Sequence, residues 1–483
     1  MNYNQLSVNL DDKQEAPLYL QLYQQLKTLI LQQQIEAGAR MPATRAFAAQ
    51  LEVARITVLQ AYRLLENEGY VESRRGAGTF VTAVLPIAET ETPFKPKLSS
   101  WGKRMSHLHR RINPSAQRPE IDFGFGRSFP HIFPYDIWRR LLARYLSTDD
   151  VMLSRYGSVA GFYPLRQALA NYLAEWRGVR CTPEQIVVVN GAQQALDLLA
   201  RLFIVEGDEV LVETPGYVDA FDLFRVHNAQ LRPLIVDQHG FSIAQIPTDS
   251  KAKFAYVTPS NQFPRGGTMP LQRRLELLQW AQTNQALIIE DDYDGELRYD
   301  GRPLSALQGL DETGHVIYLG TFSKVLFPAL RLSYVVLPQP LVKPFIQAKQ
   351  IVDRGAPTLT QAAVSDFITE GYFERHLRHL RQAYGQRRDV LEGALQRYLG
   401  ESVAYVPEPA GLHIMLDLPA QMNEAQLVQE ARKAGVGVYA GQPYHLHTAP
   451  NPSILLGFSG VSEDQIEEGV RRLAAVMQAI AMS

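Results

Sequence analysis

Hydrophobic side chains recur at helical spacing near the start of the chain and predict three helices. The first is expected over residues 17–35, where Leu22 and Leu26 fall on one face. A short second helix is expected over residues 44–51 and a third over about residues 55–68. A tight helix, turn, helix arrangement follows from these lengths and spacings.

Two short strand-like runs follow the third predicted helix and indicate a hairpin. Residues 70–73 and 79–81 flank the sequence RRGAG at positions 74–78. Glycines let a backbone come close to a polyanion, and arginine guanidinium groups bind phosphate oxygens. Helices followed by such a wing predict a DNA-binding domain over residues 1–82.

The region from residue 121 to 483 alternates short apolar runs with segments of helical spacing. The runs lie at residues 186–189, 210–212, 254–257, 287–289 and 316–319, and the helical spacing covers residues 193–203 and 271–282. This alternation predicts an α/β domain around a mainly parallel sheet. Ligands bind beyond the C-terminal ends of such strands, so the residues after each run are candidates for a site.

Residues 83–120 are predicted to be a linker because prolines recur there and no periodic apolar face survives. Within it, the stretch from Lys95 to Arg118 holds seven Lys or Arg and no Asp or Glu. Two readings of this basic half stay open: it lies along the DNA backbone, or it is a solvated tether.

Composition narrows the class of protein. The chain has 483 residues, 46% of them hydrophobic and 20% charged, which excludes global disorder and predicts about three domain-sized units. With Cys181 as the single cysteine no intrachain disulfide can form, and neither a secretory signal nor a membrane-spanning run is present, so a cytoplasmic protein without a membrane partner is expected. His445 and His447 lack further clustered ligands, so no metal is expected.

Five motifs follow the five apolar runs: GAQQAL, ETPGY, TPSNQFPRG, EDDYDGEL and TFSKVLFPALRLSY. A site for pyridoxal phosphate (PLP) needs an amine for the aldehyde, a carboxylate for the pyridine nitrogen, a side chain that stacks on the ring and donors for the phosphate. Lys324 is the candidate amine, Asp291 the candidate carboxylate and Tyr217 the candidate stacking residue. Asn261 and Tyr293 can hydrogen-bond the phenolic oxygen of the ring.

The phosphate has its own candidate donors. The hydroxyls of Thr321 and Ser323 and the charge of Arg331 suit it, as do the backbone N–H groups of Ala192 and Gln193 at a helix start. Singly, a lysine is usually a solvated charge and a glycine before a helix is ordinary. Five such signals in order favour a PLP pocket.

These motifs resemble those of the fold-type I aminotransferases over about residues 120–483. The resemblance implies that Lys324 forms a Schiff base with PLP and that a small C-terminal α+β subdomain completes the domain. It also implies that Tyr156, in YGSVAGFYPLR, reaches the phosphate of a dimer partner.

The first eighty residues, through MPATR, VARITVLQAYRLLENEGYV and RRGAGTFV, resemble the winged helix-turn-helix of the GntR family of bacterial regulators. Arg45 or Arg55 would read bases, because arginine can grip guanine O6 and N7 together. Ala54 stands where a serine is common in that family. The DNA contacts that the resemblance implies are Arg40, Arg45, Arg55, Thr57 and Gly78.

The whole layout resembles the MocR-type regulators, a winged helix joined to an aminotransferase-like domain. The resemblance implies a head-to-tail homodimer that binds a double-stranded DNA operator and senses PLP, or an amine or amino acid that reacts with it. Control of vitamin B6 metabolism is the expected subtype.

Two alternatives stay open: an active PLP-dependent aminotransferase with a DNA-binding head, and a DNA-binding protein whose large domain is a dimerisation scaffold. Aminotransferases place a carboxylate-binding arginine near the C-terminus, and residues 452–459 contain none. Its absence lowers the odds of ordinary transamination, although Arg127 or Arg354 can supply the charge.

Overall fold

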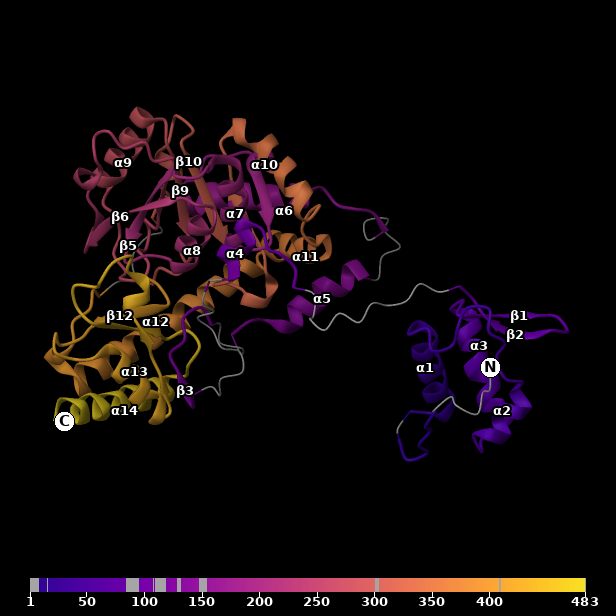
Figure 1. Cartoon of the computed structure of the whole chain (residues 1–483). Helices are drawn as coiled ribbons and strands as arrows, with labels where there is room; N and C mark the ends of the chain where they lie inside the picture. Colours follow the sequence, from indigo (N-terminus) through magenta and orange to yellow (C-terminus); the bar gives the residue numbers. More distant parts are fainter. Residues whose placement is uncertain are drawn as a thin grey trace. The chain divides into compact units, whose positions relative to one another are not determined.

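The computed structural model describes residues 8–14, 16–83, 95–106, 108, 119–127, 132–146, 154–299, 304–407 and 410–482. The chain forms two compact units, Met1–Lys97 and Leu98–Ser483, and each is described by itself. Figure 1 shows the two sets of elements that they contain.

The first unit is a three-helix bundle with a two-stranded wing. Its elements are α1 (Leu18–Leu31), α2 (Thr44–Gln50), α3 (Arg55–Asn67), β1 (Val71–Arg74) and β2 (Gly78–Val81). The strands pair antiparallel, with Val71 opposite Val81. Both valines are buried in the same core as Leu22, Phe47 and Val58, so the wing is part of the hydrophobic unit.

The first helix is shorter than its apolar spacing predicted. It ends at Leu31, not near residue 35, and Gln33 takes a left-handed backbone conformation with φ +57°. Ile35 is nevertheless buried, at 2% exposure, because the turn folds it back onto the bundle. Its apolar side chain therefore belongs to the core but not to the helix.

The second unit contains an eight-stranded mixed sheet in the order β4-β11-β10-β9-β8-β5-β6-β7. Neighbours from β10 to β6 run parallel, whereas β11 and β7 pair antiparallel with their neighbours. The five predicted runs are all strands, and the pattern missed β6, β7 and β11. The strands are β4 (Ile186–Val189), β5 (Glu209–Thr214), β6 (Gln230–Asp237), β7 (Gly240–Phe241), β8 (Phe254–Val257), β9 (Leu287–Asp292), β10 (Val316–Thr321) and β11 (Ser333–Val336).

Helices lie against both faces of this sheet (Figure 1). The helices of the second unit are α4 (Ser100–Ser106), α5 (Tyr135–Leu146), α6 (Tyr163–Arg177), α7 (Ala192–Phe203), α8 (Val218–Val226), α9 (Leu271–Asn284), α10 (Gln339–Val352), α11 (Thr358–Thr369), α12 (Tyr372–Tyr398), α13 (Glu424–Lys433) and α14 (Glu463–Ala481). Alternate residues of β4 enter different cores: Val187 and Val189 pack in the cluster that holds residues of α7 and α8, and Val188 in the cluster that holds residues of α6 and α11. Burial on both faces explains why β4 reads as an unbroken apolar run.

A smaller α+β part follows α12. Its sheet has the order β12-β15-β14, and a separate pair joins β13 to β3 in parallel. The strands are β3 (Ile121–Asp122), β12 (His413–Asp417), β13 (Val436–Gly437), β14 (Tyr439–Ala440) and β15 (Ser453–Gly457).

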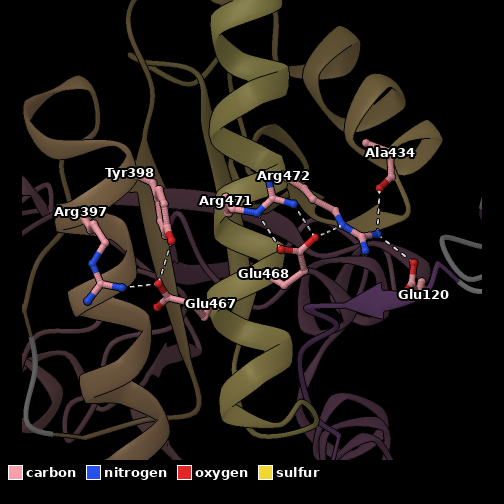
Figure 2. Close-up of polar contacts among 8 residues, drawn as sticks. All are labelled: Glu120, Arg397, Tyr398, Ala434, Glu467, Glu468, Arg471 and Arg472. Carbon is pink, nitrogen blue, oxygen red and sulfur yellow. Dashed lines mark hydrogen bonds and ion pairs between the residues drawn. The ribbon is translucent and has the colours of Figure 1, made fainter.

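Polar contacts on α14 connect this part to the segment that enters β3. Arg472 donates to Glu468 on its own helix at 2.7 Å and to Glu120 at 2.8 Å (Figure 2). Glu467 accepts from Arg397 and from the Tyr398 hydroxyl at the end of α12. Arg397 thus connects α12 to α14, and Arg472 connects α14 to the segment before β3.

The predicted linker contains one described helix, α4. Its Arg104 donates through Nε to the carbonyl of Val226 at the end of α8, at 2.8 Å. The second compact unit therefore begins at Leu98 and includes this helix. Among the described residues, no helix is long and apolar enough to cross a membrane.

Candidate coenzyme site and DNA-binding surface

The strand register brings the predicted phosphate-binding segments to one edge of the sheet. Ser333 pairs with Val189 on one side and with Thr321 on the other, so the ends of β4 and β10 lie level with the start of β11. Asp291 and Thr321 were predicted to follow their strands, and that placement is wrong. Each lies within the last two residues of its strand, β9 or β10, because the ladder continues through them.

Lys324 lies just beyond β10 against an aromatic ring. Its Nζ is 4.3 Å from the ring centroid of Phe125. A Cβ on Gly126 would come within 2.6 Å of the same nitrogen, so the glycine leaves the space that the amine uses. Burial lowers the pKa of Lys324 to about 8, although the carboxylates of Asp294 and Asp291 act in the opposite direction. A larger share of this amine is therefore uncharged, and nucleophilic, near neutral pH than in an exposed lysine.

Asp291 is a buried carboxylate held by a tyrosine on the neighbouring strand. The hydroxyl of Tyr256, on β8, donates to Asp291 Oδ2 at 2.5 Å. Burial raises the pKa of Asp291 to about 6, and the hydrogen bond from Tyr256 opposes that rise. The carboxylate is thus still ionised at neutral pH and can accept from a protonated pyridine nitrogen.

Asn261 and Tyr293 form one hydrogen-bonded group, as their shared predicted role requires. Asn261 Nδ2 donates to the Tyr293 hydroxyl at 3.1 Å and to Asp294 Oδ2 at 2.7 Å. Gly411 passes so close that a Cβ there would lie 2.8 Å from Asn261 Nδ2. The amide therefore has a fixed orientation.

Tyr217 is the N-cap residue of α8, at the end of the ETPGY motif. Its hydroxyl donates to Asp219 Oδ2 at 3.2 Å, and its ring meets that of Phe263 edge to face with 5.9 Å between centroids. Burial raises its pKa, so the hydroxyl stays protonated and the ring presents a neutral surface.

The predicted phosphate donors gather at the start of α7. Gly191, the N-cap, has φ +112°, and a Cβ there would lie 2.6 Å from Arg331 Nη2. That same nitrogen donates to the Asn190 carbonyl at 3.2 Å. The Thr321 hydroxyl oxygen accepts from Ser333 Oγ at 2.8 Å and from the backbone N–H of Ser323 at 3.1 Å, which fixes its direction.

The residues present fit PLP. Gln193 Nε2, in the first turn of α7, is buried and has no partner of good hydrogen-bond geometry among the described residues, although the Gln193 side chain acts on the nearby Tyr217 hydroxyl. An amide donor, free backbone N–H groups of the first turn and an arginine make a donor set for a dianionic phosphate. Lys324 and Asp291 supply the amine and the carboxylate that the rest of the coenzyme requires.

Three residues that the sequence suggested for this site, Tyr156, Arg354 and Arg127, do not join the coenzyme-binding residues within one chain. Tyr156 is 86% exposed, and the guanidinium of Arg354 lies 5.9 Å from its ring centroid, so within one chain it does not join the pocket. Arg127 is paired with the buried carboxylate of Asp122 at 2.5 Å.

The pocket also contains residues that the sequence did not single out. Tyr256 looked like an ordinary apolar member of the run FAYV, and Phe125 and His413 lie far from every motif quoted for the site. Contacts across strands give these residues their place. The local sequence signal for this part of the pocket is the pair of glycines, Gly126 and Gly411, that leave room for Lys324 and Asn261.

The predicted DNA contacts lie on the first unit. The four that have side chains are at least partly exposed: Arg40, Arg45, Arg55 and Thr57. Arg55 is the first residue of α3, and its Nε donates to Thr44 Oγ1 at the start of α2, at 3.3 Å. Arg40 bridges to Phe80 in the wing, and Gly78 leaves room for its guanidinium, because a Cβ there would lie 2.9 Å from Arg40 Nε. The structure thus joins the start of α3 to that of α2, and Arg40 to the wing.

Two family models match the chain in the order of these units. "Bacterial regulatory proteins, gntR family" covers residues 18–81, and "Aminotransferase class I and II" covers residues 131–473. A solved kynurenine aminotransferase of Pyrococcus horikoshii, in complex with PMP, is 32% identical, covers 75% of this chain and 92% of its own, and has a TM-score of 0.71. The fold and site therefore define a winged-helix protein with a fold-type I aminotransferase domain.

Relatives with both units extend over nearly the whole chain. The "probable rhizopine catabolism regulatory protein MocR" of Rhizobium meliloti is 37% identical over 98% of this chain and 96% of its own. The "HTH-type pyridoxine biosynthesis transcriptional regulator PdxR" of Corynebacterium glutamicum is 29% identical over 95% and 96%. The chain belongs to the MocR-type regulators of the GntR family.

Proposed function

We propose that this protein is a transcription regulator that binds an operator through its winged helix and changes its DNA affinity when its large domain binds PLP or an amine that reacts with PLP. The observation that carries the proposal is the half-buried Lys324 beside the buried carboxylate of Asp291, in a chain that also has a DNA-binding unit. Residues 1–82 are the DNA-binding domain and 121–483 the coenzyme-binding domain; the linker between them, 83–120, includes α4, which packs on the second unit through Arg104.

The residues have separate tasks at the coenzyme. When bound, PLP supplies an aldehyde carbon that a primary amine attacks. Lys324 would hold that carbon through its amine, and Asp291 would accept a hydrogen bond from the ring nitrogen. The phosphate would be bound by Thr321, Ser323, Arg331 and the first turn of α7, with Ala192 and Gln193. Tyr217, Asn261 and Tyr293 would orient the ring.

We propose that the regulator is a head-to-tail homodimer. Tyr156 and Ile351, at 86% and 88% exposure, are large apolar side chains left uncovered by their own chain, which suits burial against a second copy. Two heads would then bind two half-sites, with Arg40, Arg45, Arg55, Thr57 and Gly78 of each at the DNA.

Operator affinity with and without PLP tests this function. Duplexes selected from a random pool on the full chain provide the operator, and a fluorescence titration gives the dissociation constant. We expect the constant to change with PLP in the wild type and to stay constant in Lys324→Ala. Equal affinities in the wild type would refute the switch.

A relative named as a regulator of pyridoxine biosynthesis suggests the subtype. PdxR of C. glutamicum is described as a pyridoxine biosynthesis regulator. Its likeness to this chain supports PLP as the sensed molecule and B6 metabolism as the controlled process. Operator release or binding caused by PLP without any added amine would support this subtype.

An active aminotransferase with a DNA-binding head is the second candidate, favoured by the likeness to the kynurenine aminotransferase. The five residues of β15, SILLG, are all buried and none is cationic, so this strand offers no counter-charge for a substrate carboxylate. Mixing the PLP-loaded chain with a panel of amino acids for a single turnover decides the question. Conversion to the pyridoxamine form, and its return to the PLP form when a 2-oxo acid is added, would favour the enzyme.

A further inference from the structure

His413 is a buried polar side chain in the aromatic wall beside Lys324. It opens β12, is 8% exposed, and its ring meets that of Phe125 edge to face with 4.8 Å between centroids. Phe125 is the same ring that lies 4.3 Å from Lys324 Nζ. His413 is therefore separated from the reactive amine by a single aromatic side chain.

The protonation of the His413 ring follows from its one hydrogen bond. Nε2 lies 3.0 Å from the carbonyl oxygen of Pro264, and a carbonyl accepts but cannot donate, so Nε2 carries the proton. Burial lowers the pKa of His413 to about 3, and the charge of Lys324 adds to this effect, so the ring is neutral near pH 7. Nδ1 is then a bare acceptor.

This acceptor has no partner among the described residues. Its other close ring neighbour, Phe263 at 5.2 Å, has no donor to offer. A buried acceptor left without a donor is unfavourable, and such groups in proteins usually face a ligand or an ordered water. His413 also lines a small cavity together with Asn261, which joins it to the coenzyme-orienting group.

The strand next to His413 carries no positive charge. His413 pairs with Gly457 on β15, and none of the five residues of that strand is cationic. The nearby Arg127 is committed to Asp122. Arg265 and Arg388 line the same cavity, but they are paired with Asp417 and Asp389. The wall therefore offers a hydrogen-bond acceptor, and its described cations are already in ion pairs.

We propose that His413 Nδ1 accepts a hydrogen bond from the small molecule that reaches Lys324, and that this molecule is a primary amine carrying a second donor, a hydroxyl or an N–H group. The inference rests on the proposed function and names the effector class for the same site. Amino alcohols and diamines belong to this class, and simple alkylamines do not.

Matched amines test the selectivity. Aminoethanol, aminopropanol and aminobutanol, each with a terminal hydroxyl, are compared with propylamine, butylamine and pentylamine, in which a methyl group replaces that hydroxyl. Each is titrated into the PLP-loaded full chain while the visible absorption band is followed. We expect at least one amino alcohol to bind about tenfold more tightly than its partner, the usual gain from one buried hydrogen bond.

His413→Phe removes the acceptor and should abolish this preference, whereas His413→Gln keeps an acceptor oxygen and should retain part of it. His413→Leu replaces the phenylalanine variant if that variant does not fold. No preference in any wild-type pair, or a preference that persists without the acceptor, would overturn the inference. If the wild type shows no PLP band at all, the proposed function fails, and this inference with it.

Discussion

Replacing Tyr256 with phenylalanine tests how the site keeps Asp291 ionised. The hydroxyl donates to Asp291 Oδ2 at 2.5 Å, and both groups are buried. A hydrogen bond to a charged group contributes roughly 1.5–3 kcal/mol. One pKa unit corresponds to about 1.4 kcal/mol, so its loss should raise the Asp291 pKa by about one to two units.

The affinity for PLP should then become strongly pH dependent. With a wild-type pKa of about 6, most Asp291 is ionised at neutral pH. In Tyr256→Phe the midpoint moves to roughly 7–8, and affinity scales with the ionised fraction. We expect PLP to bind about five- to fiftyfold more weakly near pH 6, with the gap nearly closed near pH 8.5.

The assay is a titration of the PLP-free chain with PLP across this pH range, followed by its absorption band. Tyr318→Phe is the matched control, because Tyr318 lies on β10, on the other side of β9, and donates to Asp292 Oδ2 at 2.6 Å. It removes an equally buried hydroxyl without touching Asp291. Tyr256→Phe and wild-type curves with the same pH midpoint would refute the reasoning.

Three further outcomes are expected. The rate at which the PLP-free chain captures PLP, measured by stopped flow, should rise with pH and level off above about 8, because the uncharged amine of Lys324 attacks. A rate that keeps rising toward the pKa of an exposed lysine would contradict this expectation. Gly191→Ala places a Cβ 2.6 Å from Arg331 Nη2 and should weaken PLP binding about tenfold or more, whereas Gly207→Ala, also at positive φ but with open space around it, should leave the PLP dissociation constant unchanged. Ala54→Ser should supply the side-chain cap that α3 lacks and stabilise the winged helix by about 1 kcal/mol in thermal unfolding, and an unchanged melting temperature would argue against capping.

Local pattern predicted the buried strands well. Runs such as residues 186–189 and 254–257 are apolar on both faces and coincide with β4 and β8. β6 was missed because its exposed and buried positions alternate beside polar residues and Pro233. β11 was missed because its first two residues, Ser333 and Tyr334, end the motif that was assigned to the coenzyme site.

The candidate site was predictable where a motif carries it and not where contacts across the fold do. Lys324, Asp291 and Arg331 stand in ordered motifs, and the structure places them at one edge of the sheet. Tyr256 and His413 act through partners 35 and 149 residues away, so no local pattern marks them. Strand ends were also misplaced, because ladder hydrogen bonds extend through polar residues such as Asp291.

The coupling between the two units is tested most directly by its reciprocity. If PLP changes operator affinity by some factor, the operator must change PLP affinity by the same factor. The PLP dissociation constant of the full chain is therefore measured with saturating operator and with a scrambled duplex. We predict a change equal to that seen in the DNA titration; the same PLP affinity on both duplexes would show that the two units bind independently and would contradict a PLP-responsive regulator.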